Sequence, residues 1–95
     1  MDTEVRLNSL IESRPEIRGG RPCIDGTGVT VRRIAQWYRI GDTPEDIVDR
    51  IGHLSLAQIY AALAYYRANQ DAIEADLAEE VTAAELLARR HGAER

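Results

Sequence analysis

The side chains with the clearest chemical potential lie in a glycine-rich run at residues 17–31. Two turns of this run, at residues 19–21 and 26–28, can present backbone amides to a phosphate group, with Arg18 or Arg21 as the counter-charge. The glycine spacing fits neither a Walker loop nor a dinucleotide-binding fingerprint. The demand of tight turns for glycine explains the run more simply. The run predicts a turn-rich arm with short extended segments, and a phosphate-binding module stays an alternative.

Arginine charge is concentrated early in the chain. The formal net charge is -4, yet residues 1–40 carry a net +2 and residues 41–95 a net -6. All twelve basic residues are arginines, which favour bidentate contacts to phosphate or carboxylate groups. We therefore predict that Arg32, Arg33 and Arg39, on the outer face of a helix, contact operator DNA. A solvated face, or salt bridges to the acidic later segment, is the alternative.

Catalytic and metal-binding constellations are not apparent. Cys23 is the single cysteine and is interpreted as a structural thiol. His53 and His91 fall in a turn and near the chain end, without a nucleophile or carboxylate tied to either. The carboxylates around Glu45 suit the positive end of a helix dipole better than a metal ion. We expect no cofactor, no metal and no enzyme activity.

Capping signals define the helices that position these residues. The spacing predicts a first helix over residues 31–40, with Thr30 as its N-cap and Gly41 closing it. Its predicted buried face consists of Val31, Ile34, Ala35 and Tyr38, which recur at helical spacing. Thr43 followed by Pro44 starts a second, short helix, and Gly52 ends it with a left-handed turn.

A third helix opens with the capping-box pair Ser55 and Gln58, so the second and third helices form a helix-turn-helix. Its other early side chains are almost all apolar. Only Gln58 and, near the helix end, Arg67 and Asn69 are of types that can reach base edges in the major groove of DNA. The pattern favours a helix-turn-helix used for packing over one that reads sequence.

The segment after Asn69 is amphipathic. It is acidic at first, and its apolar residues recur at helical spacing: Ile73, Leu77, Val81, Ala84 and Leu87. We predict that this stripe binds another protein, with its acidic face suited to a basic partner, whereas folding back onto the earlier helices is the alternative. Thr82 and Glu85 have capping-box spacing, so a break into two helices near Val81 is expected.

The architecture that follows is a single, mainly α domain with three parts. Residues 1–28 form a β/turn arm, residues 29–68 a helix-turn-helix core of three helices, and residues 69–95 an amphipathic helical extension. With 44% apolar residues in 95, the chain has more apolar surface than a domain this small can bury. We therefore predict a homodimer in which the strand edges at residues 9–11 and 22–24 pair between copies. No run reaches membrane-spanning length, and the N-terminus has no signal-peptide pattern, so a cytoplasmic protein without a membrane role is expected.

Three runs of the sequence carry a resemblance to a known family: Ile-Arg-Gly-Gly-Arg-Pro-Cys-Ile-Asp-Gly-Thr at 17–27, Gly-Asp-Thr-Pro-Glu-Asp-Ile at 41–47, and Leu-Ser-Leu-Ala-Gln-Ile-Tyr-Ala-Ala-Leu-Ala-Tyr-Tyr at 54–66, with Val31 and Ile34 between them. The chain resembles the bacterial domain of unknown function 433 family over residues 8–80. The resemblance implies a homeodomain-like helical fold. Many members are encoded beside a PIN-like ribonuclease as antitoxins.

The resemblance implies an antitoxin of a toxin-antitoxin pair, which binds and neutralises a PIN-like ribonuclease and represses its own operon. In this hypothesis the segment after Asn69 lies along the nuclease through Ile73, Leu77, Val81 and Leu87, and Arg89 or Arg90 neutralises the metal-binding carboxylates of the nuclease. Two copies in a dimer would strengthen weak operator binding. A stand-alone helix-turn-helix DNA-binding regulator remains the alternative function.

Overall fold

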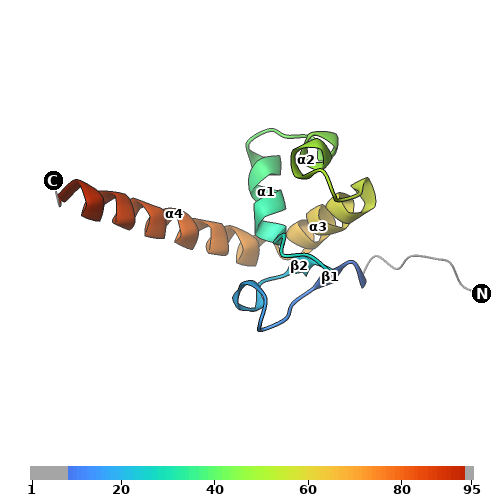
Figure 1. Cartoon of the computed structure of the whole chain (residues 1–95), viewed down its shortest axis with the longest axis horizontal. Helices are drawn as coiled ribbons and strands as arrows, with labels where there is room; N and C mark the ends of the chain where they lie inside the picture. Colours follow the sequence, from blue (N-terminus) through green and yellow to red (C-terminus); the bar gives the residue numbers. More distant parts are fainter. Residues whose placement is uncertain (1–8, 94–95) are drawn as a thin grey trace, which may run out of the picture.

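The computed structural model describes residues 9–93 of the chain (Figure 1). The predicted arm and extension therefore lie partly outside the described residues, at 1–8 and 94–95. Two strands, β1 (Ile11–Glu12) and β2 (Cys23–Ile24), precede four helices: α1 (Val31–Arg39), α2 (Pro44–Ile51), α3 (Leu56–Ala68) and α4 (Gln70–Ala93). The mainly α architecture with a short N-terminal β hairpin is confirmed.

The arm is held by pairing within one chain. β1 and β2 are antiparallel, with Ile11 opposite Ile24, and Cys23 also forms a bridge with Thr30 immediately before α1. Ile24 is fully buried and therefore fixes the hairpin to the helical core. Within the described residues each strand has one edge paired inside the chain, so pairing between two copies would need the edge of β1 that does not face β2, and it stays a prediction.

Caps set the helix boundaries as the sequence predicts. The Thr30 hydroxyl accepts a hydrogen bond from the amide of Arg33 at the start of α1. Thr43 and Asp46 form a reciprocal capping box on α2, and Gly52 ends that helix with φ 84°. Ser55 and Gln58 form the corresponding box on α3, so two capped helices enclose a short turn.

The hydrophobic core lies between α1, α3 and the start of α4, and α2 closes one side (Figure 1). Val31, Ile34 and Ala35 supply the buried face of α1, as predicted. Tyr38 was expected on this face, but its ring is exposed and the Arg67 guanidinium lies 5.5 Å from its centroid. The last turn of α1 extends past the core, so its apolar spacing no longer implies burial.

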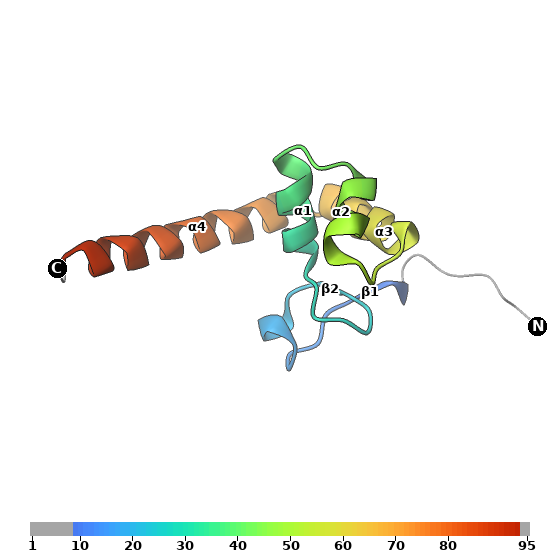
Figure 2. The same cartoon turned by 45° about the horizontal axis from the view of Figure 1, so that its top comes forward.

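α4 is one continuous helix that leaves the domain (Figures 1 and 2). Its 24 residues span about 36 Å at 1.5 Å per residue. The predicted break near Val81 is wrong, because Thr82 lies inside the helix and its hydroxyl donates to the Ala78 carbonyl at 3.0 Å. A threonine side chain can be satisfied in this way without ending a helix.

Candidate partner-binding site

The proximal half of α4, residues 70–80, is docked on the domain. Ile73 and Leu77 are only 5% and 6% exposed and belong to the core cluster. On the side toward the arm, the Asp76 carboxylate accepts two hydrogen bonds, one from Arg21 Nε at 3.0 Å and one from a terminal nitrogen of Arg32 at 3.0 Å. Apolar burial and these ion pairs together fix the direction in which the rest of the helix points.

A second polar network joins α4 to the end of α3. The Tyr66 hydroxyl donates to Glu74 Oε2 at 2.6 Å, and Gln70 Nε2 donates to the same oxygen at 3.0 Å. These hydrogen bonds, that of Tyr66 first, lower the pKa of the Glu74 carboxyl from its ordinary value. Burial, followed by the bond to Glu74, raises the pKa of the Tyr66 phenol.

Three of the six acidic residues of α4 bind groups of the chain itself. Glu74 binds Tyr66, Asp76 binds two arginines, and Glu80 lies 3.4 Å from the Arg32 guanidinium. These carboxylates therefore attach the helix to the domain. This face offers a basic partner fewer free charges than the sequence indicates.

The distal half of α4, residues 81–93, projects away from the domain (Figure 2). Every residue from 81 to 90 is exposed, including three large apolar side chains: Val81 at 54%, Leu86 at 57% and Leu87 at 56%. Arg89 and Arg90 are exposed as well, without a carboxylate partner in the described part of the chain. The distal half of α4 is thus a solvent-exposed helical segment with apolar side chains followed by two arginines.

The predicted partner-binding stripe divides between these two halves. Ile73 and Leu77 are buried in the chain's own core, which corrects their assignment to a surface for another protein. Val81 and Leu87 continue the same helical face beyond the domain and remain available. Folding back, the alternative reading, is therefore right for the first part of the segment and wrong for the second.

The arginines of α1 have different surroundings. Arg32 is bound to Asp76 and Glu80, the alternative that the sequence left open, and so it does not face solvent freely. The Arg33 guanidinium lies 5.9 Å from the centre of the Trp37 ring and is exposed. Arg39 is exposed at the end of the helix. Of the three predicted DNA contacts, the structure leaves Arg33 and Arg39 accessible.

α3 presents little that could read a base. In the capping box, the side-chain oxygen of Gln58 accepts a hydrogen bond of 2.7 Å from the backbone N–H of Ser55. The Arg67 guanidinium lies over the rings of Tyr38 and Tyr66. The exposed large apolar side chains of this helix are Leu56 and Tyr60. The structure therefore brings none of the predicted base-contacting groups together on one face of α3.

Sequence reasoning missed two residues of interest, Leu86 and Trp37. Leu86 lies off the predicted stripe, so a search for a single periodic face passes over it. The ring of Trp37 has two guanidinium groups near it, that of Arg33 at 5.9 Å and that of Arg50 at 5.3 Å from the ring centre. Spacing indicates the first contact, which is four residues apart in α1, but the second depends on how α2 packs.

Among residues 9–93 we identify neither a metal-binding cluster nor a reactive thiol. Within that range no group of three or more His, Cys, Asp or Glu side chains could hold a metal ion. Cys23 is buried, its thiol donates to the Arg21 carbonyl at 3.3 Å, and burial raises its pKa. Such a thiol is protonated and unreactive at neutral pH. None of the described helices is long and apolar enough to cross a membrane.

Comparisons with known proteins agree with this fold. Residues 11–66 match the family described as "Protein of unknown function (DUF433)", a match that ends within α3 and excludes α4. The crystal structure of a DUF433 member protein from Anabaena variabilis ATCC 29413 superposes with a TM-score of 0.70 at 24% sequence identity. The alignment covers 76% of this chain and 71% of that one. No curated protein matches the sequence.

Proposed function

The chain belongs to the DUF433 family, and from the structure of its last helix we propose that it is an antitoxin, a non-enzymatic protein that binds and neutralises a PIN-like ribonuclease. The observation that supports protein binding is the uncovered distal half of α4. The nature of the partner comes from the family resemblance, since many members are encoded beside such a nuclease. The complex forms in the cytoplasm in this proposal.

Between residues 81 and 90 the distal half of α4 has no buried side chain whose tertiary contacts would stabilise it as a helix. Helices shorter than about 12–15 residues are marginal in water, and the distal half of α4 carries Val81, Leu86 and Leu87 exposed to solvent. Burying one such side chain contributes about 1.5–3 kcal/mol. A partner groove would therefore stabilise the distal half and gain affinity from the same contacts, in the helix-in-groove mode.

The docked half of α4 prepares this binding. Because Ile73, Leu77 and Asp76 fix the helix to the core, less orientational freedom is lost on association than with a flexible tail. Arg89 and Arg90 lie beyond the apolar positions, toward the tip. In the proposed mechanism the apolar residues seat the helix on the nuclease, and the arginines pair with the carboxylates that would otherwise bind its catalytic metal ions.

Operator binding is a second, separate activity in this proposal. The exposed positions of Arg33 and Arg39 favour it, as phosphate contacts. The apolar exposed face of α3, around Tyr60, does not favour sequence readout. Autoregulation therefore requires a homodimer or the toxin complex to supply more contacts, and a stand-alone DNA-binding regulator is the less supported function.

Co-expression with the neighbouring nuclease gene tests the proposal. The wild-type chain should restore growth, co-purify with the nuclease and inhibit its cleavage of RNA. Leu87→Asp, which places a charge on the distal half, should abolish all three effects. Leu56→Asp is the matched control, because Leu56 is an exposed leucine of α3 away from the distal half.

Two results would contradict the proposal. One is a Leu87→Asp variant that rescues growth as well as Leu56→Asp does. The other is a neighbouring gene product that neither inhibits growth nor binds this chain. Circular dichroism of both variants should show that the domain still folds, so that loss of rescue reports on the interface.

A further inference from the structure

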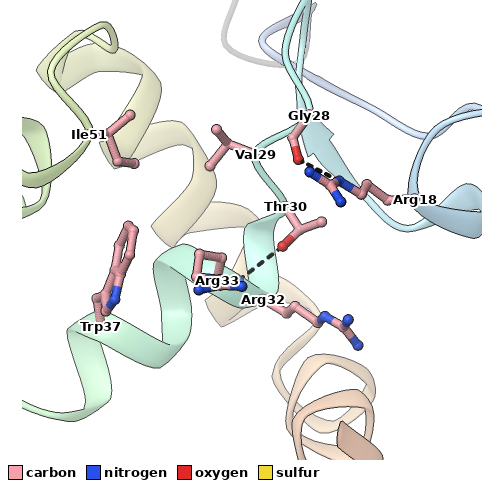
Figure 3. Close-up of a pocket in the computed structure, with 8 residues that line it drawn as sticks. All are labelled: Arg18, Gly28, Val29, Thr30, Arg32, Arg33, Trp37 and Ile51. Carbon is pink, nitrogen blue, oxygen red and sulfur yellow. Dashed lines mark hydrogen bonds between the residues drawn. The ribbon is translucent and has the colours of Figure 1, made fainter.

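A cleft of 230 Å³ opens where the arm meets α1 (Figure 3). Three arginines line it, Arg18 from the arm and Arg32 and Arg33 from α1, together with the apolar surface of Val29 and Trp37. No acidic side chain lines the cleft. A chain with net negative charge thus has a local pocket of positive charge, separate from the distal half of α4.

Two of the three arginines keep unused hydrogen-bonding capacity. Arg18 donates through Nε to the Gly28 carbonyl at 3.0 Å, which leaves its terminal nitrogens available. Arg33 lies against Trp37. Neither guanidinium pairs with a carboxylate within the described range 9–93, whereas Arg32 is neutralised by Asp76 and Glu80. The uncompensated charge of the cleft therefore belongs to Arg18 and Arg33.

The backbone holds Arg18 at the cleft with some strain. Arg18 has φ 50°, in the left-handed region that side-chain-bearing residues rarely adopt, and it begins a 3-10 turn with Gly19 and Gly20. Figure 3 shows its guanidinium folded toward Gly28, with Thr30 between Arg18 and Arg33. Arg18 and Arg33, which come from different elements of the chain, thereby line the same cleft.

The surrounding charges deepen the positive potential. The first turn of α1 contains no acidic residue and carries the unpaired Arg33, whereas the first turn of α2 carries Glu45 and Asp46. The positive end of the α1 dipole therefore adds to the arginine charge, where α2 has carboxylates to offset its own. An anion in the cleft would meet both sources of positive charge.

We propose that this cleft binds a phosphate group, with Arg18 and Arg33 as its two cationic ligands. Planar guanidinium groups donate paired N–H bonds to phosphate oxygens, and no carboxylate lines the cleft itself to repel the anion. The phosphate is carried either by a small phosphate ester or by a nucleic-acid backbone, and the experiment below separates these sources. The site is independent of the nuclease interface.

An NMR titration of the full chain with sodium phosphate, at ionic strength held constant with sodium chloride, tests the site. We expect saturable shifts of the amide signals of residues 28–33. Arg33→Gln should weaken binding about tenfold, because one charge-assisted contact is lost. Arg18→Gln should weaken it similarly. Arg89→Gln is the control: it removes the same charge from an exposed arginine outside the cleft and should bind as the wild type does.

The source of the phosphate is identified by two further titrations, with adenosine monophosphate and with a short random-sequence DNA duplex. Tighter binding of the duplex that depends on Arg33 assigns the backbone of a nucleic acid. Saturable binding of the monophosphate without the duplex assigns a small ester. The site does not exist if the phosphate shifts fail to saturate, or if Arg33→Gln and Arg89→Gln bind phosphate equally.

Discussion

The division of α4 into a docked and a free half can be tested with one substitution made at two positions. Leu77 is 6% exposed and lies in the core, whereas Leu87 is 56% exposed on the distal half. Changing each leucine to alanine removes the same atoms from the same helix and alters helix propensity equally. The difference between the two variants therefore measures burial alone.

The expected magnitudes are well separated. Truncating a buried leucine to alanine costs about 2–5 kcal/mol, through lost transfer free energy and the cavity left behind. Leu77 packs near the edge of a small core, so we expect Leu77→Ala to lower the free energy of unfolding by about 3 kcal/mol. An exposed substitution usually changes it by less than about 0.5 kcal/mol, which is the expectation for Leu87→Ala.

Urea unfolding followed by the fluorescence of the single tryptophan, Trp37, measures both values. With a denaturant slope of about 1–1.5 kcal/mol/M, Leu77→Ala should lower the midpoint by about 2–3 M. The midpoint of Leu87→Ala should match that of the wild type. Each titration is run at two protein concentrations, so that self-association can be recognised.

Either of two results would refute the reasoning. A Leu77→Ala variant as stable as Leu87→Ala would mean that the proximal half of α4 is not docked on the core. A large, concentration-dependent loss of stability in Leu87→Ala would mean that the distal half is already buried between copies of the chain. In that case the nuclease would have to compete with a homodimer for the same residues.

Three further predictions concern single groups, each measured by urea unfolding of the variant against the wild type. Asp76→Asn should destabilise the fold by about 1 kcal/mol, discounted for the partial exposure of the arginines it binds, and raising the salt concentration should reduce that difference. Because the folded pKa of Glu74 is lowered, the stabilisation it supplies is present above its ordinary pKa of 4.5 and is lost as pH falls through the folded value, so Glu74→Gln should flatten the stability profile in that acidic range. An unchanged profile would contradict the hydrogen bond from Tyr66. Gly52→Ala should cost about 1–2 kcal/mol, since φ there is 84° and no neighbouring atom would clash, and a neutral result would mean that α2 ends differently.

Much of the local structure could be predicted from the sequence. The caps at Thr30, Thr43 and Ser55 and the stop at Gly52 lie where the pattern places them, because these caps are hydrogen bonds between residues at most four apart. The buried face of α1 also follows from helical spacing. The capping-box spacing at Thr82 gave a wrong prediction, because its hydroxyl donates a hydrogen bond to the Ala78 carbonyl within a continuous helix and does not cap a new one.

The sequence by itself determined which segments are helical and which face of each is apolar, since both depend on contacts among near neighbours in the chain. Only the tertiary structure decided that Leu77 is buried and Leu87 exposed: the two share one stripe, and α4 extends beyond the domain, so the core ends before the stripe does. It also decided that Asp76 accepts a hydrogen bond from Arg21, 55 residues away, and so pairs the charge of that arginine. Charge pairing at such separations depends on how the helices pack, and no local pattern encodes it.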